Sequence, residues 1–150
     1  MNPIRILVTG ANGQSGQTFR ELAPVQKGIE FVFLSIGALS GVFLRYKMVS
    51  LPTTLGILPI NVLTVNVTGS FILGMFSILS VVWNLDTRYS LLIAIGFCGS
   101  LTTMSSFALE NIVMMENKQI LNMMINTIAN VGFSFLALYG GRILITQFMQ

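Results

Sequence analysis

The sequence contains no histidine, a single cysteine and few charged residues. Without histidine, a proton relay or metal site that works at neutral pH lacks its most common side chain. Cys98 is the only cysteine, so no disulfide can form within the chain. Charged residues make up 9% of the sequence, whereas soluble domains are about a quarter charged. Lysine and arginine do not cluster, and the basic stripe that nucleic-acid binding requires is therefore missing.

Hydrophobic residues make up 53% of the chain and gather in four blocks after residue 28. Each block reaches the length of about 20 apolar residues that a bilayer-spanning helix needs. Aromatic residues stand at the block ends, as in membrane-interface belts, and the connectors are short. Pro59 is expected in the first turn of the second helix, where proline is tolerated. The sequence predicts an all-α, multi-pass protein of the cell membrane with helices over 29–46, 57–83, 89–115 and 120–148.

The third block contains a stretch of small and hydroxyl residues, GFCGSLTTMSSFALE, at positions 96–110. Gly96 and Gly99 weaken a helix there, so the third helix is predicted to be broken. A broken helix at membrane depth persists only where it is buried in protein or lines a path for ions or water. A packing face between helices uses the same small residues, so composition alone leaves both interpretations open.

Amide and hydroxyl side chains share faces of the second and fourth helices. Asn66 and Ser70 are four residues apart, and Asn122, Asn126, Asn130 and Ser134 repeat that spacing. Such groups hold helices together, but each interhelical hydrogen bond contributes only about 0.6–2 kcal/mol. A series of this length exceeds what adhesion requires and favours a path for a hydrated solute.

The few charges in the blocks argue against a cation as that solute. Glu30 and Arg45 stand at the two ends of the first block, and Glu110 lies in the second half of the third. No carboxylate stands in the middle of the first, second or fourth block, where a cation or proton-coupled exporter needs one. The remaining hydroxyl and amide donors suit an anion. The electropositive edge of the Phe107 ring can also face an anion.

Three motifs stand in order along the blocks: GALSGVFLRY at 37–46, LTVNVTGSFILG at 63–74 and the stretch at 96–110. A fourth, NTIANVGFSFLA at 126–137, matches more loosely. In this order and spacing they resemble the small fluoride channels called Fluc or CrcB, over about residues 33–148. The resemblance implies a channel rather than an enzyme, one that lets fluoride leave the cell passively.

The same resemblance implies an antiparallel, dual-topology homodimer in lipid, with two pores and a structural Na⁺ at its centre. The backbone carbonyls of Gly99 and Thr102 are expected to bind the Na⁺. Arg45, which ends the first helix, and Glu110 are expected to be structural. The positions that match the fluoride path are Asn66, Thr103, Met104, Ser105, Ser106, Phe107, Asn130 and Ser134.

Met104 departs from the family pattern, which commonly has two phenylalanines three residues apart in the third helix. Here Phe107 is the second, and Met104 occupies the first position. A thioether is soft and fills space but has no electropositive ring edge. Throughput or selectivity is therefore expected to differ, and a heterodimer with a second, non-identical subunit of the same family remains an alternative to the homodimer.

The charges beside the helices leave the insertion orientation open. Without residues 1–27, Arg88 and Arg142 lie on one predicted side, and Arg45, Lys47 and Lys118 lie on the other. The positive-inside rule needs a clear excess on one side. Insertion in both orientations is compatible with this balance, and so is a single orientation set by a partner or by the N-terminal segment.

Residues 1–27 differ from the rest of the chain. They read as a short strand over 4–9, a turn with three glycines and the start of a helix. Residues 1–22 resemble the opening of the dTDP-4-dehydrorhamnose reductases, whose glycine turn cradles the phosphates of a dinucleotide. No second strand, ribose-binding acid or Tyr-x-x-x-Lys pair follows, so the segment is predicted to be a Rossmann-like, truncated remnant without function. Residues 28–150 are then the four-helix channel domain.

Two other functions remain as alternatives to a fluoride channel. In the first, the chain is a non-conducting scaffold or assembly subunit whose polar groups bind only other subunits. In the second, it is a membrane-anchored, NAD(P)-dependent reductase, which cofactor binding by the isolated chain would reveal.

Overall fold

The computed structural model describes residues 28–50, 54–55 and 58–149. The chain divides into two units, Met1–Val32 and Phe33–Gln150, and the second contains nearly all of the described residues. The strand, glycine turn and helix expected within residues 1–27 lie outside the described part.

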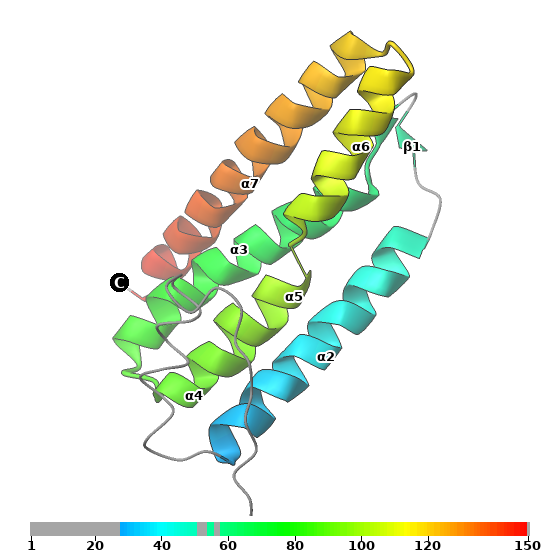
Figure 1. The fold of residues 1–150 in the computed structure, drawn as a ribbon. Helices are drawn as coiled ribbons and strands as arrows, with labels where there is room; N and C mark the ends of the chain where they lie inside the picture. The colour runs from blue at the N-terminus through cyan, green and yellow to red at the C-terminus, as the bar shows by residue number, and fades with distance from the viewer. Residues whose placement is uncertain (1–27, 51–53, 56–57, 150) are drawn as a thin grey trace, which may run out of the picture. The chain divides into compact units, whose positions relative to one another are not determined.

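Four helical spans are long and apolar enough to cross a membrane, as the sequence predicts (Figure 1). Between the first two, β1 (Thr54–Leu55) and β2 (Leu58–Pro59) form a short antiparallel pair. Successive spans run in opposite directions through the fold (Figure 1). The spans are α2 (Ile29–Ser50), α3 (Asn61–Val82), a composite third span over Thr87–Glu116, and α7 (Ile120–Phe148).

The prediction for the start of the second helix is wrong by one turn. Helix α3 begins at Asn61 rather than at residue 57, and Pro59 lies in β2 instead of in the first helical turn. A proline disfavours the helical conformation of the residue before it, so a helix cannot run easily through Leu58. Helix α2 extends to Ser50, one turn beyond its predicted end.

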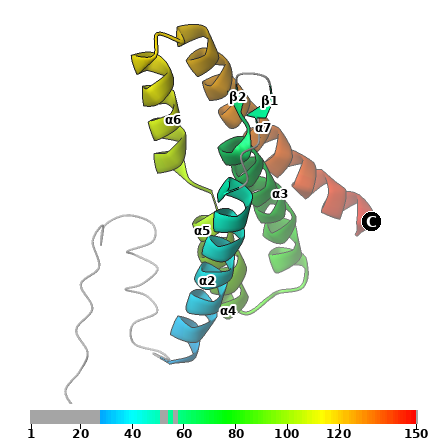
Figure 2. The ribbon, with the colours of Figure 1, turned by 90° about the vertical axis from the view of Figure 1, so that its right-hand side faces the viewer.

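The composite third span is broken, as predicted, and the break falls after the two glycines. Its first part consists of α4 (Thr87–Ser90), the π-helical segment η1 (Leu91–Cys98) and α5 (Gly99–Leu101). Thr102 (φ −104°, ψ 109°) and Thr103 (φ −122°, ψ 106°) are extended. Helix α6 (Met104–Glu116) then resumes, offset from α5 in both views (Figure 2).

Helices α3 and α7 run in the same direction and make the most extensive contact of any pair of elements. Glycines let their backbones meet toward the end of α3. A Cβ on Gly74 would overlap the carbonyl oxygen of Leu138, and one on Gly141 would overlap that of Phe71. Close approach at glycine is the usual way for membrane helices to gain packing contacts.

Helix α2 packs on η1 by the same means. A Cβ on Gly37 would overlap the carbonyl oxygen of Leu92, and one on Gly41 would overlap that of Phe97. The two glycines are one helical turn apart and both are buried. This contact places α2 against the part of the third span that precedes the break.

Many large apolar side chains point outward, Leu39 on α2 and Phe135 on α7 among them. Contiguous exposed apolar surface of this kind is rare on soluble monomers. In a membrane, lipid or another subunit covers it.

The connector between α3 and α4 is held by a local ion pair. Asp86 accepts from the Arg88 backbone N–H and from its guanidinium, each at 2.9 Å. The side-chain hydrogen bond from Arg88, followed by the backbone one, lowers the pKa of Asp86 to about 2. The carboxylate is therefore charged at neutral pH and caps α4.

Candidate functional site

The break in the third span leaves backbone groups without helical partners. The Thr103 N–H donates to Oδ1 of Asn66, at 2.8 Å, instead of to a carbonyl of the preceding turn. Helix α5 ends with carbonyl oxygens facing the break, while α6 begins with N–H groups that no side chain caps. The start of α6 therefore carries partial positive charge and the end of α5 partial negative charge.

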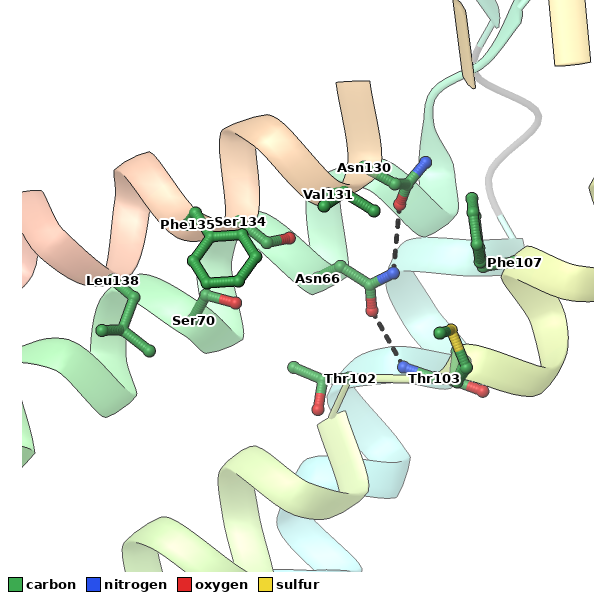
Figure 3. A pocket seen from close by; sticks show the side chains of 11 residues that line it. Asn66, Ser70, Thr102, Thr103, Phe107, Asn130, Val131, Ser134, Phe135 and Leu138 are labelled. Carbon is green, nitrogen blue, oxygen red and sulfur yellow. Dashed lines mark hydrogen bonds between the residues drawn. The ribbon is translucent and has the colours of Figure 1, made fainter. Parts of the chain in front are cut away.

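Asn66, on α3, joins the break to the fourth span. Its Oδ1 accepts from Thr103, and its Nδ2 donates to Oδ1 of Asn130 on α7, at 3.1 Å (Figure 3). Figure 3 shows the Asn66 side chain between these two partners, with both hydrogen bonds dashed. A single amide thus links three different spans.

The hydrogen bonds continue along α7 and end on α6. Asn130 Nδ2 donates to the backbone oxygen of Asn126 at 3.2 Å and to its Oδ1 at 2.9 Å. Asn126 Nδ2 donates to Oδ1 of Asn111 at 3.2 Å and to Oε2 of Glu110 at 3.5 Å. Asn126 and Asn130 are buried, with 3% and 4% of their surface exposed. We call Asn66, Asn130 and Asn126 the amide network.

A groove of about 400 Å³ lies beside Asn66, open on one side (Figure 3). None of the residues that line it carries an ionisable side chain, so the groove offers amides, hydroxyls, a thioether and apolar groups. The lining residues are Asn66, Ser70, Thr102, Thr103, Met104, Phe107, Asn130, Val131, Ser134, Phe135 and Leu138.

Two serine hydroxyls in the groove are available to a ligand. Hydroxyls elsewhere in the helices, such as those of Thr64 and Ser77, donate to a carbonyl of the preceding turn. Ser70 and Ser134 line the groove, and within the described residues neither makes a hydrogen bond. Each can therefore donate to a ligand in the groove without losing an existing partner.

Met104 and Phe107 lie in the first turn of α6 at the groove. The side of Met104 away from the groove is open, since 73% of its surface is exposed. The Phe107 ring is half-buried and lies on the α6 side of Asn66 in Figure 3. The first turn of α6 thus has one aromatic ring where the family pattern has two, and Phe135 of α7 supplies a second ring to the groove lining.

Ser105 and Ser106, both expected in the fluoride path, do not line the groove. Their hydroxyls lie 3.1 Å and 3.3 Å from Oγ1 of Thr103, and the three form a small cluster at the start of α6. Arg45 and Glu110 also lie outside the groove lining. Glu110 instead accepts from Asn126 at the end of the amide network.

Backbone oxygens at the break fit the chemistry of an alkali cation. Within the described residues, no hydrogen bond reaches the carbonyl oxygens of Gly99 and Thr102. Gly99 is exposed, so a cation can approach it from outside the chain. In the part of the chain that the structure describes, no three His, Cys, Asp or Glu side chains gather as metal ligands. A cation here would be bound by backbone oxygens.

Helical spacing indicates two polar residues beyond those that match the fluoride path of the family. Ser70 follows Asn66 by four residues on α3, and Asn126 precedes Asn130 by four on α7. The spacing places each on the same helix face as a site residue. The spacing does not distinguish Ser70, which lines the groove, from Asn126, which does not.

Comparison with known proteins gives a family match over most of the second unit, Phe33–Gln150. Residues 32–142 match the family described as CrcB-like protein, Camphor Resistance (CrcB), and residues 1–27 lie outside the match.

Several named relatives are similar over nearly their full length. The chain is 58% identical over 124 residues to the fluoride-specific ion channel FluC of Nitrosopumilus maritimus, covering 83% of this chain and 98% of the relative. It is 37% identical to FluC of Methanococcus aeolicus, over 77% of this chain and 94% of that protein. It is 34% identical to FluC 1 of Staphylococcus aureus, over 75% of this chain and 93% of that protein.

Proposed function

This chain belongs to the CrcB-like family, and we propose that it is a fluoride channel through which the ion leaves the cell passively. The ion is identified by the similarity of this chain to relatives that are named fluoride-specific ion channels. The chain covers 98% of the length of the relative from Nitrosopumilus maritimus, so nearly all of that protein has a counterpart here. These relatives are named as channels, which favours transport over an enzymatic reaction.

The chemistry of the groove supports an anion as its occupant. Asn66, Ser70 and Ser134 can donate hydrogen bonds into it, and no carboxylate lines it. Fluoride binds water strongly, so a pore must replace the lost water with protein donors in a region of low dielectric constant. The uncapped N–H groups at the start of α6 add partial positive charge beside Met104.

The proposed path through the membrane requires a second subunit. The groove is open on one side, and Met104 stands exposed at its edge. We propose that an antiparallel copy of the chain in the lipid bilayer closes the groove and forms the other wall of the pore. The near balance of basic residues on the two sides of the membrane permits such dual insertion. A heterodimer with a second family member is the alternative, because Met104 replaces the first aromatic ring.

A sodium ion at the centre of the dimer is part of the proposal. The carbonyl oxygens of Gly99 and Thr102, which have no other partner in the described residues, would bind it. The ion would supply fixed positive potential near both pores. The chain itself provides the oxygens and the break in the helix that turns them away from the helical hydrogen-bond pattern.

Ion efflux from liposomes that contain the purified full-length chain tests the proposed function. A fluoride-selective electrode should record rapid loss of fluoride, and a chloride electrode should record almost none under the same conditions. Empty liposomes provide the control for leakage. Purified, assembled protein that passes neither ion would favour the non-conducting scaffold, and equal passage of both would contradict a fluoride-specific channel.

A further inference from the structure

The Asn66 carboxamide can bind either a cation or an anion, depending on which of its two ends faces the groove. Its oxygen accepts hydrogen bonds and would attract a cation, whereas its NH₂ group donates and would attract an anion. The two ends are nearly the same size, so steric fit does not choose between them. The orientation is decided by the groups that hydrogen-bond to the amide.

Two backbone groups fix the orientation of the whole amide network. The Thr103 N–H can only donate, so the Asn66 atom that faces it must be the oxygen. The Asn126 carbonyl can only accept, so the Asn130 atom that faces it must be the nitrogen. The oxygen of Asn130 then faces the nitrogen of Asn66, which agrees with the hydrogen bond between them. Neither amide can turn over without setting like atoms against each other.

The number of N–H groups in the network determines which of them stays free. Asn130 Nδ2 donates to two oxygens of Asn126, and Asn126 Nδ2 donates to Asn111 and Glu110. Each of these NH₂ groups has two hydrogens and two acceptors. Asn66 Nδ2 makes one hydrogen bond within the described residues, so its second N–H stays free at the groove.

We propose that Asn126 and Asn130 are positioning residues that make Asn66 present an N–H to the groove while its oxygen is occupied. The amide network thereby makes the groove selective for a small anion. This inference rests on the proposed function, and it adds the reason why a neutral amide acts there as a donor only. It also assigns a role in ion selectivity to Asn126, which does not line the groove.

Asn126 is the residue to test, because it is buried and can act on the groove only through Asn130. Replacing it with leucine removes one of the two acceptors that hold Asn130. The Asn126 backbone carbonyl and the Thr103 N–H still favour the present orientation, but the preference is weaker without the Asn126 side chain. Asn130 and Asn66 then turn over for part of the time, and the Asn66 oxygen repels the anion while they are turned over. Since one such hydrogen bond contributes about 1 kcal/mol, the fluoride concentration for half-maximal flux should rise, by at most about fivefold. The ratio of fluoride to chloride flux should fall by a similar factor.

The experiment compares three full-length chains in liposomes: wild type, Asn126→Leu and Asn122→Leu. Spacing alone places Asn122 in the same series, one turn before Asn126 on α7, but in the structure it does not line the groove. Its amide donates only to the Gln119 side chain in the described residues. The leucine there makes the same chemical change outside the amide network. Fluoride flux is measured over a range of fluoride concentrations, and chloride flux in parallel, with the amount of assembled dimer determined by size-exclusion chromatography.

The expected result is a higher half-maximal concentration and lower selectivity for Asn126→Leu, with wild-type values for Asn122→Leu. If Asn126 is purely structural, the maximal flux falls with the amount of assembled protein, while the half-maximal fluoride concentration and the selectivity stay unchanged. That result overturns the inference but not the proposed function. Asn126→Ala, which adds no bulk, gives the same readout if the leucine variant does not assemble. Failure of both to assemble makes the network structural and also overturns the inference. A wild-type chain that passes no fluoride overturns the proposed function and the inference together.

Discussion

The two ends of the α3–α7 contact are built differently. At the end near the break, Asn66 and Asn130 join the helices through side-chain amides. Toward the other end, Gly74 and Gly141 let the backbones touch, with each glycine against a carbonyl oxygen of the facing helix. The same two helices thus use hydrogen bonds in one half and close packing in the other.

The difference shows how one helix pair can hold a groove open and still stay together. Backbones that touch at glycine leave no space for an ion and gain van der Waals contact. At Asn66, side-chain amides rather than touching backbones join the helices, and the groove and the break in the third span meet there. The glycine half therefore stabilises the pair, and the amide half provides the chemistry. Substitutions in the two halves should separate stability from flux.

The largest effect is expected for Asn66→Asp, in the amide half. The carboxylate places a negative charge beside the groove, and two like charges about 4 Å apart repel by about 4 kcal/mol at an effective dielectric constant near 20. Fluoride flux from liposomes should fall about 1,000-fold per amount of assembled protein. Asn122→Asp makes the same change outside the groove and should conduct normally. Flux at the wild-type level in Asn66→Asp would remove Asn66 from the ion path.

The next largest effect is expected where Gly74 and Gly141 bring α3 and α7 together, and it should lower the free energy of unfolding. In Gly141→Ala the new Cβ overlaps the carbonyl oxygen of Phe71, so the helices must move apart. Overpacking of this kind costs about 1–3 kcal/mol. A Cβ on the adjacent Gly140 would meet no atom within 4 Å, so Gly140→Ala should leave stability unchanged or raise it. Thermal unfolding in detergent compares the pair, and equal midpoints would show that the close contact does not hold the helices.

The smallest effect is expected for the serines of the groove. Ser70→Ala and Ser134→Ala each remove a donor that has no partner in the described residues, so stability should not change. Loss of one hydrogen bond to an anion of about 1.5 kcal/mol would lower fluoride flux about tenfold. Ser80→Ala, also on α3, is the control, because that hydroxyl donates to the Ser77 carbonyl. A wild-type rate in both groove variants would mean that the ion does not pass these hydroxyls.

The spans and the break can be predicted from the sequence because both depend on local properties. Hydrophobic length identifies a spanning helix, and small hydroxyl residues in the third block indicate the break, which lies at Thr102 and Thr103. Sequence alone places the start of α3 one turn too early, because Pro59 is assigned to the helix rather than to β2. A boundary of this kind depends on how the preceding loop pairs with itself.

The candidate site can be predicted less completely, since it depends on which face of each helix meets the others. Asn66, Asn130 and Ser134 do come together at the groove. Ser105 and Ser106 carry the same hydroxyls but bond to Thr103 at the start of α6. Residue type and spacing do not separate these cases, because a hydroxyl next to a helix break can face either a groove or the break itself.

Hydrophobicity and residue type along the chain are enough to establish four membrane spans, an interruption in the third, and interior polar groups that are mostly amides and hydroxyls. These properties act locally and need no partner to be recognised. The occupied oxygen and free N–H of Asn66 follow only from how the spans pack together. An amide has two ends of nearly equal size, and only neighbours distant in sequence, the Thr103 N–H and the Asn126 carbonyl behind Asn130, determine which end faces the groove.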